Sequence, residues 1–502
     1  MRTINQINFT CACLGAVALW LSSLVVASPV QGSELWTACA KVDITPERPI
    51  FLQGQTCTRI HTKVDSPLLA TLLAIETREN GEYKDGAIFI SFDFCFLTEE
   101  FMTRFRQAIA EAIPEFECDK LIVSVTHSHT SYCLLNDEYL TDRTDVMSPA
   151  ESIEFITSKV VPAAADCWRN KQQSQFSFAL GDAVVARCRR AVYEGGRALM
   201  YGETNAHDFR SLEAMEDHDV GLIYFWDNNN RLLAIVINVA CPAQTVESLA
   251  TVNADYWHEV RLLIEERYGS DVVLLPVCGA AGDMSPHLLY NKAAESRMRS
   301  LRGSSEMRDI AMRIVRAVDE NIKPAEKDRQ ASVILIHKCH KIDVPQAIIE
   351  KDVYDQAVAS AEHFRAEMEN ADDRGASGSY VLYRWQKAII DRYNAQQETE
   401  HPCFRVPIHV LRISGLVICT NPFELYCDYG IEIKARSLAT QTLISQLTDL
   451  DNVGGYLPTS RSIASGSYGS TPASFKVGPD GGRLLVEETL RMIEEVFRER
   501  EE

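Results

Sequence analysis

Histidines, carboxylates and tyrosines that could bind a metal or move a proton lie in four short segments of the sequence. The first segment contains His127 and His129 and directly follows an apolar run that ends at Val125. On an extended chain, histidines at positions i and i+2 point to the same side. Both can therefore reach one metal ion, or one can bind the metal while the other handles protons. A solvated strand end can carry the same pair, so the pair alone leaves this choice open.

The other three segments supply a serine, a carboxylate and two phenols. A glycine-rich turn carries Asp283 and Ser285, where the backbone can approach a ligand closely and the serine can be oriented for reaction. The turn lacks the Gly-x-Ser-x-Gly pattern, which argues against an ordinary serine hydrolase. Glu424 follows another apolar run, where a carboxylate can bind a metal, act as a base or simply begin a helix. A late loop carries Tyr456 and Tyr468.

Alternating strand-like and helix-like segments must position these side chains. β-branched and aromatic runs predict strands over 87–92, 121–125, 235–239, 272–277, 333–336 and 408–418. Amphipathic patterns predict helices from Thr98 to the residue before Pro114, and over 257–268, 354–368 and 484–497. This alternation predicts an α/β fold, and the absence of repeats and linkers predicts one domain. Residues 372–379 are rich in Asp, Gly and Ser and predict a flexible insertion, and residues 451–482 predict a long functional loop.

Composition and the first residues indicate an exported globular protein. Hydrophobic residues make up 46% of the chain and charged residues 24%, and the net charge of −20 argues against nucleic acid or anionic membranes as partners. Residues 1–32 combine Arg2, an apolar stretch over 14–27 and small residues, which predicts a cleaved signal peptide, with an uncleaved anchor as the alternative. No later segment predicts a transmembrane span. The mature protein is expected in the periplasm or outside the cell. The fifteen cysteines show no Cys-x-x-Cys pair and give no disulfide prediction.

The motifs, in this order, resemble those of the neutral ceramidases. That family opens with Asp-Ile-Thr-Pro, here residues 43–46, and continues with Thr-His-Thr-His-Ser, here Thr-His-Ser-His-Thr at 126–130. Gly-Asp-Val-Ser-Pro, Pro-x-Glu and two tyrosines follow in the family, and they match residues 282–286, 422–424 and the pair Tyr456 and Tyr468. The resemblance spans about residues 38–482. It implies an α/β sandwich of two β-sheets flanked by helices, formed by a ceramidase-like catalytic domain over residues 33–502 without the family's C-terminal immunoglobulin-like domain.

The resemblance also implies a zinc site in which one position departs from the family. Carried over by motif, the zinc ligands are His127, Glu424 and Tyr456. The family's remaining histidine lies in an Ala-Val-His-Pro motif, which here reads Val-Ala-Cys-Pro and puts Cys241 in its place. A thiolate is a good zinc ligand, so Cys241 can substitute directly. Alternatively the site is vacant, or is rebuilt with a nearby histidine: His218, His258 or His287. The histidines expected to be structural or solvated are His337, His340 and His409.

The remaining implied roles complete a hydrolase. His129 would hydrogen-bond the attacking water or protonate the leaving amine, and Ser285 would act as nucleophile or as an orienting hydrogen-bond partner. Tyr468 and Arg189 would stabilise the oxyanion. The resulting hypothesis is an exported zinc-dependent hydrolase that cleaves the amide bond of a small N-acyl or lipid-like substrate, as in sphingolipid metabolism. Two alternatives remain: a catalytically inactive binding protein on the ceramidase fold that has lost its zinc, and an esterase that uses Ser285.

Overall fold

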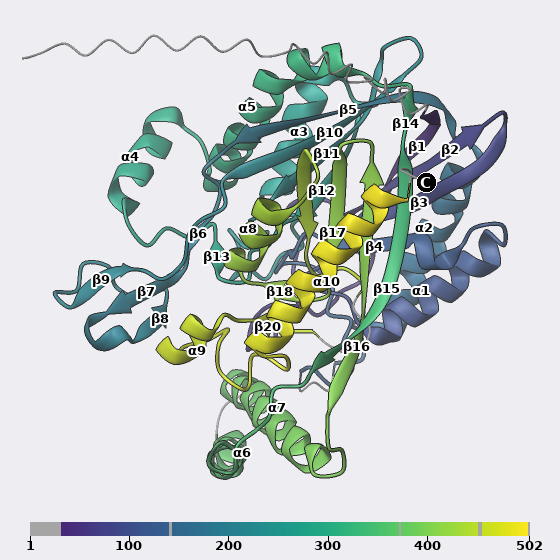
Figure 1. Cartoon of the computed structure of the whole chain (residues 1–502). Helices are drawn as coiled ribbons and strands as arrows, with labels where there is room; N and C mark the ends of the chain where they lie inside the picture. The colour runs from purple at the N-terminus through teal and green to yellow at the C-terminus, as the bar shows by residue number, and fades with distance from the viewer. Residues whose placement is uncertain (1–31, 140–142, 371–372, 450–453, 500–502) are drawn as a thin grey trace, which may run out of the picture.

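Two β-sheets form the centre of the molecule. The computed structural model describes residues 32–139, 143–370, 373–449 and 454–499 (Figure 1). The large sheet has nine strands, in the order β12-β11-β10-β5-β1-β2-β3-β4, and β14 pairs with β1. Its strands are β1 (Ser33–Asp43), β2 (Leu69–Glu79), β3 (Glu82–Phe92), β4 (Leu121–Val125), β5 (Gln172–Asp182), β10 (Asp219–Asp227), β11 (Leu232–Val239), β12 (Val273–Cys278) and β14 (Ser332–Val333). The smaller sheet has the order β15-β16-β17-β19, with strands β15 (Leu335–Pro345), β16 (Cys403–Ile413), β17 (Leu416–Thr420) and β19 (Gln441–Ser445).

Helices cover the outer faces of the two sheets. On the large sheet these are α1 (Glu99–Ala112), α2 (Pro149–Arg169), α3 (Tyr256–Tyr268) and α5 (Glu306–Ala325), and on the small sheet α8 (Cys427–Arg436) and α10 (Pro479–Arg498). A separate apolar core, which includes Phe89, Val236 and Leu411, fills the space between the sheets. Burial of apolar surface on both sides of each sheet is the main driving force for this layered packing. The predicted α/β sandwich of two sheets flanked by helices is therefore confirmed.

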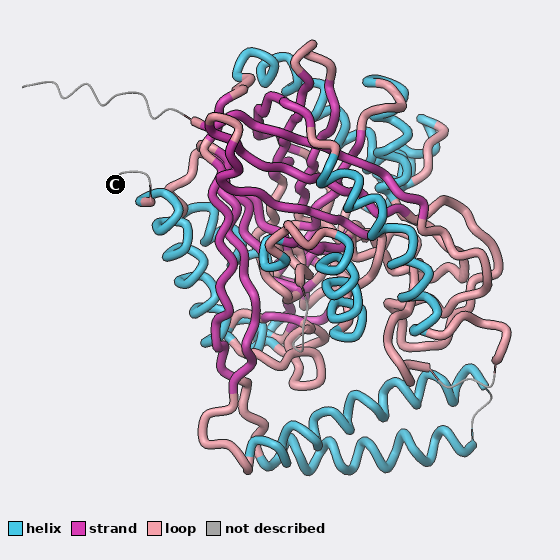
Figure 2. Tube along the Cα trace, turned by 90° about the vertical axis from the view of Figure 1, so that its right-hand side faces the viewer, coloured by secondary structure: helices cyan, strands magenta, loops and turns pink. Residues whose placement is uncertain are grey.

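Shorter elements surround the sandwich. The short strands are β6 (Arg187–Cys188), β7 (Arg190–Tyr193), β8 (Ala198–Met200), β9 (Phe209–Leu212), β13 (Met284–Ser285), β18 (Glu424–Leu425) and β20 (Tyr456–Leu457). The other helices are α4 (Lys292–Arg302), α6 (Lys351–Asn370), α7 (Asp373–Gln396) and α9 (Ser460–Ser465), and the 3-10 helices are η1 (Cys118–Lys120), η2 (Glu194–Gly196) and η3 (Glu326–Asp328). Helices α6 and α7 run side by side as a hairpin at one end of the molecule (Figures 1 and 2).

Three connections between parallel strands orient the loops that matter for function. β3 and β4 are parallel neighbours linked through α1, and β11 and β12 are parallel neighbours linked through α3. β17 and β19 are likewise parallel and are linked through α8. The large sheet is strongly curved, so that β12 at one edge contacts β2, β3 and β4 near the other. Because of this curvature, the loops that follow β4, β11, β12 and β17 can meet at one place. These loops leave the carboxyl ends of parallel strands, which is where open α/β sheets bind ligands.

Most predicted elements are present. The strand at 121–125 is β4, the helix that begins after Thr98 is α1, and Thr98 accepts a hydrogen bond from the amide of Phe101 at 3.2 Å as its N-cap. β3, β11 and β12 correspond to the strands predicted at 87–92, 235–239 and 272–277. α3, α6 and α10 correspond to the helices predicted at 257–268, 354–368 and 484–497. Of the described helices, none has the length and apolarity needed to cross a membrane.

Three predictions of local structure were wrong. The strand predicted at 408–418 is two antiparallel strands, β16 and β17, that reverse at Ser414, where φ is 52°. The insertion predicted at 372–379 is the start of helix α7, apart from residue 372, which lies outside the described residues. The loop predicted at 451–482 contains β20, α9 and the first turn of α10 in its described part. The predicted signal peptide at 1–32 falls almost entirely outside the described residues, and the single-domain assignment stays a prediction.

Candidate metal centre

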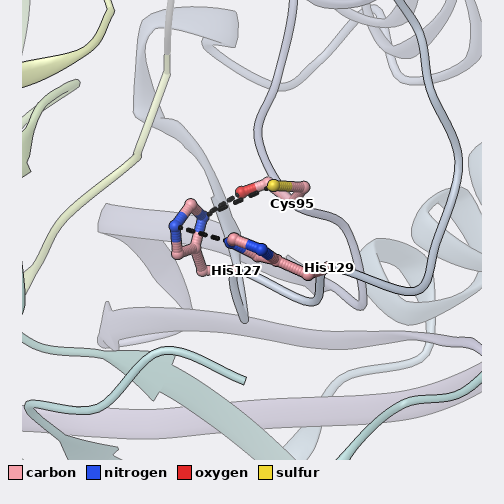
Figure 3. Close-up of side chains that lie close together, drawn as sticks. All are labelled: Cys95, His127 and His129. Atoms are coloured by element: carbon pink, nitrogen blue, oxygen red, sulfur yellow. Dashed lines mark hydrogen bonds between the residues drawn. The ribbon is translucent and has the colours of Figure 1, made fainter. Parts of the chain in front are cut away.

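The segment that follows β4 carries the two histidines. Cys95 follows β3 and His127 follows β4, and these strands are in register at Phe92 and Val125. His127 has a φ of 60°, in the left-handed region that a non-glycine residue rarely occupies and that recurs at functional sites. The extended-chain prediction is therefore wrong at His127. The rings of His127 and His129 still meet edge to face, with centroids 4.8 Å apart and planes at 87° (Figure 3).

The His127 ring is oriented by the backbone of Cys95. Nδ1 of His127 donates to the carbonyl oxygen of Cys95 at 2.6 Å, and the thiol of Cys95 lies 3.8 Å from the same nitrogen (Figure 3). Nε2 of His127 lies 3.3 Å from Oε2 of Glu424 and 3.3 Å from Nε2 of His129. Cys95, His127 and His129 each offer one ligand atom, and these atoms lie within 4.8 Å of one another. A hydrogen bond from Nδ1 to a carbonyl is the usual way to fix a metal-binding imidazole.

Glu424 and Tyr456 are brought together by a short pair of parallel strands. Glu424 on β18 pairs directly with Tyr456 on β20, and the amide of Glu424 donates to the carbonyl of Gly455 at 3.0 Å. The glycine-rich turn packs against the same backbone: a Cβ on Gly282 would lie 2.3 Å from the carbonyl oxygen of Glu424. Gly282 is therefore needed at this point because the two backbones approach closely.

Arg189 interacts with the carboxylate of Glu424 and with both loop tyrosines. Its guanidinium carbon is 5.4 Å from the ring centre of Tyr456 and 6.0 Å from that of Tyr468, and its Nη2 donates to the carbonyl of Gly282 at 2.8 Å. The two tyrosine rings are 5.3 Å apart, and Tyr468 is stacked on Trp385 of α7 at 5.9 Å. The segment that carries Tyr468 is anchored by the buried Arg190, which donates to the Tyr468 carbonyl at 2.9 Å.

Ser285 is buried in a small hydrogen-bond network. Its hydroxyl lies 3.0 Å from the hydroxyl of Tyr201, and it accepts from the Gln244 side chain at 3.2 Å and from the amide of His287 at 3.1 Å. Among the described residues, no imidazole ring hydrogen-bonds this hydroxyl. The serine therefore lacks an adjacent base, which an activated nucleophile needs. The arrangement favours an orienting role for Ser285.

The carboxylate of Glu247 contacts the imidazole of His129. Oε2 of Glu247 lies 3.1 Å from Nδ1 of His129, and Oε1 of Glu247 lies 3.2 Å from Nε2 of His287. Arg59 fixes both backbones, because its guanidinium donates to the carbonyl of His129 at 2.7 Å and to the carbonyl of Glu247 at 2.6 Å. The imidazole also rests against Gly54, where a Cβ would lie 2.5 Å from the ring.

Burial and neighbouring charges shift the pKa values of these groups. Burial raises the pKa of the Glu424 carboxyl, but His127 and then Arg189 outweigh it, so that this pKa is lowered. Burial raises the pKa of the Tyr468 phenol to about 12. Burial also raises the pKa of the Cys95 thiol, but His129 and His127 outweigh it and lower this pKa to about 6. Burial lowers the pKa of both imidazoles, but Cys95 outweighs it with the help of Glu424 at His127 and Glu247 at His129, so that the pKa of His127 is raised and that of His129 is raised to about 9. The ionised forms of Glu424 and Cys95 are therefore favoured by the positive charge of the two imidazoles.

The Cys241 thiol is not part of the cluster of possible ligand atoms formed by Cys95, His127 and His129. This thiol is fully buried and lies 3.5 Å from the carbonyl of Pro242, and burial and then the Cys278 thiol raise its pKa. The other groups that act on this thiol are Tyr256, whose hydroxyl donates to the Cys241 carbonyl at 2.8 Å, and Asp255. The structure therefore brings six of the predicted site residues together: His127, His129, Glu424, Tyr456, Tyr468 and Arg189. Ser285 is linked to Arg189 through Tyr201. The Cys241 thiol lies outside this group.

The other histidines have separate partners. His287 contacts Glu247 beside the centre, whereas His218 contacts Glu216 at 3.2 Å and His258 lies on α3. His337 and His409 are buried and contact each other at 3.0 Å, and His409 also contacts the buried Asp449 at 2.9 Å, which fits the first of the two predicted alternatives, a structural role. His340 lies 3.8 Å from Glu495 at the surface.

Sequence reasoning missed three residues around the centre: Cys95, Glu247 and Arg59. Cys95 lies between two phenylalanines, a setting that by itself predicts a core residue. The signal that could have found it is its position just after β3, because β3 is the parallel neighbour of β4, which precedes His127. Glu247 and Arg59 lie in loops without a periodic pattern, and no sequence signal pairs them with His129.

The donor set suits zinc. Zinc binds imidazole nitrogen and carboxylate oxygen at about 2.1 Å, so two ligand atoms of a tetrahedral site lie about 3.4 Å apart. The separations of 3.3 Å from His127 Nε2 to Glu424 Oε2 and to His129 Nε2 match this spacing. The residues present therefore fit the zinc ion that the motif resemblance implies.

Comparison with known proteins identifies the fold. No protein-family model matches the chain, and no curated protein sequence matches it. A solved structure described as a ceramidase complexed with C2 has a TM-score of 0.65 and 13% identity, and the match covers 93% of this chain and 76% of that one. The neutral ceramidase from Pseudomonas aeruginosa also gives a TM-score of 0.65 and 13% identity, over 92% and 75% of the two chains. The chain therefore has a ceramidase-like fold.

Proposed function

We propose that this protein is an exported zinc-dependent hydrolase that cleaves the amide bond of an N-acyl, ceramide-like substrate. The observation that carries the proposal is the 3.3 Å approach of His127 Nε2 to Glu424 Oε2, with Tyr456 paired to the same glutamate. Three segments far apart in the sequence supply these groups. Burying such polar groups at one point is unfavourable unless a partner compensates them. A bound cation provides that compensation.

The ligands and the substrate-facing groups lie on different segments. His127, Glu424 and Tyr456 would hold the ion, as the motif resemblance implies. Zinc bound there would lower the pKa of a coordinated water and polarise an amide carbonyl. Arg189 and Tyr468 supply positive charge and a phenol hydroxyl for the carbonyl oxygen as it becomes negative. Ser285 orients the substrate through its hydroxyl.

The overall reaction is hydrolysis without a covalent enzyme intermediate. The oxygen of water adds to the amide carbonyl carbon, the carbon–nitrogen bond breaks, and the amine nitrogen takes the proton. The products are a carboxylic acid and a free amine. The fold of the two ceramidase structures and the order of the motifs support an N-acyl lipid amide as the substrate class.

A second candidate is a binding protein that retains the fold without catalysis. The observation that favours it is Cys241, which replaces a family zinc ligand and whose thiol faces Pro242 and Cys278. A site that lacked the ligand at this position would hold zinc weakly.

Metal analysis and turnover on one preparation separate these candidates. The full chain is expressed with its leader and purified from the exported fraction, and zinc is measured beside hydrolysis of a short-chain N-acyl sphingoid amide and its matched ester. The proposal expects about one zinc per chain and amide hydrolysis that a chelator removes and added zinc restores. Ester hydrolysis that resists the chelator and disappears in Ser285→Ala would instead indicate the esterase. Absence of metal and of both activities after zinc is supplied would indicate the binding protein.

A further inference from the structure

We propose that His129, which lies against Glu247, is a protein ligand of the metal together with His127 and Glu424 and takes the place that the motif resemblance gives to Cys241. This inference rests on the proposed metal site. It assigns His129 to metal binding rather than to proton transfer. It thereby decides between the two roles that the spacing of the histidines leaves open.

The first line of support is the direction of the lone pairs. Nδ1 of His127 is occupied as a donor to the Cys95 carbonyl, so in the neutral ring Nε2 carries the lone pair. That nitrogen lies 3.3 Å from a carboxylate oxygen of Glu424, which can only accept when ionised, and 3.3 Å from Nε2 of His129. Two neutral imidazoles and a carboxylate directed at one buried point repel each other unless a proton or a metal cation lies between them. A metal ion there would be bound by all three.

The second line of support is the contact on the far side of His129. A metal-binding histidine typically donates its other ring nitrogen to a carboxylate or a carbonyl, which fixes its tautomer and orientation. Oε2 of Glu247 lies 3.1 Å from Nδ1 of His129 as an ion-pair contact without hydrogen-bond alignment, whereas the Cys95 carbonyl accepts a hydrogen bond from Nδ1 of His127. Arg59 binds the backbone carbonyls of both His129 and Glu247, so the contact is held by the loops themselves. Each histidine thus has an oxygen atom beside its Nδ1, as a hydrogen bond at His127 and as an ion-pair contact at His129.

Cys95 and Cys241 are less suited than His129 to this ligand position. The Cys241 thiol contacts the carbonyl of Pro242 and interacts with the Cys278 thiol. The Cys95 thiol lies 3.8 Å from Nδ1 of His127, on the side of the ring away from the free lone pair. A set of two histidines and one glutamate is a common catalytic zinc site and leaves a position open for water. In this arrangement Tyr456 lies beside Glu424 at the edge of the ligand set.

The test replaces zinc with cobalt in the purified mature protein and needs no substitution in its first step. Cobalt bound by nitrogen and oxygen gives only weak visible bands, whereas a thiolate ligand adds a strong sulfur-to-cobalt band in the near ultraviolet. We expect no sulfur band in the unmodified protein. A strong sulfur band would overturn the assignment of His129 and favour a cysteine ligand.

Substitutions then measure the affinity for zinc by competition with a chelator. His129→Ala and His129→Gln are expected to lose tight binding, and Glu247→Gln to weaken it about 10- to 100-fold. Cys241→Ala and Cys241→Ser are expected to retain it. His363→Ala, on the exposed face of α6, is the matched histidine control. Far-ultraviolet circular dichroism checks that each variant is folded.

The outcomes separate this inference from the proposed function. If the unmodified protein binds zinc and hydrolyses the amide while folded His129 variants keep full zinc affinity, His129 is not a ligand and the hydrolase proposal stands. Loss of zinc in folded Cys241 variants alone would likewise overturn the assignment of His129 and leave the hydrolase proposal intact. If the unmodified protein binds neither zinc nor cobalt, both proposals fail.

Discussion

Arg189 connects the carboxylate side of the centre to the two loop tyrosines. It lies near both tyrosine rings and is fixed by the Gly282 carbonyl. Arg189→Lys keeps the charge but loses the planar set of donors, so the oxyanion would be stabilised less. We expect kcat for amide hydrolysis to fall about 100-fold with KM little changed. Steady-state kinetics test this, with Arg187→Lys as the control because Arg187 binds Glu216 away from the tyrosines. An equal fall in both variants would contradict a specific role for Arg189.

Asp283 makes the stability of the protein depend on pH in an unusual direction. Burial raises the pKa of its carboxyl from the ordinary value of 3.8 to about 7. Between these two values the folded state binds more protons than the unfolded state, so this group's contribution to the free energy of unfolding falls as pH rises. Asp283→Asn cannot ionise and keeps an acceptor for the Cys427 amide, which Asp283 binds at 2.8 Å.

Denaturant titrations of both proteins at about pH 5 and about pH 8 test the prediction for Asp283. The free energy of unfolding of the wild type should fall relative to that of Asp283→Asn by about 2–3 kcal/mol over this range. A wild type that gains stability relative to the variant over this range would show that the native carboxyl is ionised.

Residue types and order were enough to predict most members of the centre, but not its geometry. His127, Glu424 and Tyr456 are found by motif, and they do lie together. The positive φ at His127 could not be predicted, because it follows from packing after β4 and not from the residue type. The direction of the Cys241 thiol is also set by its buried neighbours, and its role as a ligand stays a prediction.

At the level of the elements, the glycine-rich turn and β18 must lie close together for the site to form. Ala at position 282 would bring its Cβ 2.3 Å from the Glu424 carbonyl oxygen, which belongs to the backbone and cannot rotate away. We expect Gly282→Ala to lower the free energy of unfolding by about 1–3 kcal/mol and to weaken zinc binding. Thermal unfolding and chelator competition measure both effects.

A second glycine provides the control for Gly282. Gly378 lies within α7, and a Cβ there would meet only the Thr56 carbonyl at an ordinary 3.8 Å. Gly378→Ala should therefore raise stability by about 0.5–1 kcal/mol, because alanine is the better helix former. The same loss in both variants would contradict the close-approach explanation.

Two of the elements that were mispredicted have different physical causes. Residues 408–418 are mostly apolar but contain the turn dipeptide Ser414-Gly415, and the chain reverses there so that β16 pairs with β17. Helix α7 begins in a stretch rich in Asp, Gly and Ser, and its partner α6 stabilises it through side-by-side packing. At α7 contacts between elements override local preference, whereas at Ser414 the local turn signal was present in the sequence.

The whole molecule carries a strong negative charge, which should affect how it meets a lipid substrate. A net charge of −20 repels anionic surfaces over about 10 Å at moderate salt. We expect an N-acyl substrate to be turned over more slowly in anionic vesicles than in zwitterionic ones. Added salt should reduce the difference. Turnover measured in both vesicle types at low and high salt checks this, and faster turnover on anionic vesicles at low salt would point to a local basic surface.

The stacking of Trp385 on Tyr468 couples the helical hairpin to the centre of the molecule. Trp385 is half-buried, and its ring lies 5.9 Å from that of Tyr468, whereas Trp168, Trp226 and Trp257 are buried elsewhere. A ligand that contacts Tyr468 should change the indole's surroundings and hence the intrinsic fluorescence of the protein. Titration with a non-hydrolysable N-acyl amide should shift the emission, and Trp385→Phe should abolish the shift while binding persists. Trp385 would then act as an intrinsic optical reporter of substrate binding. It would do so although it precedes its stacking partner Tyr468 by more than eighty residues in the sequence.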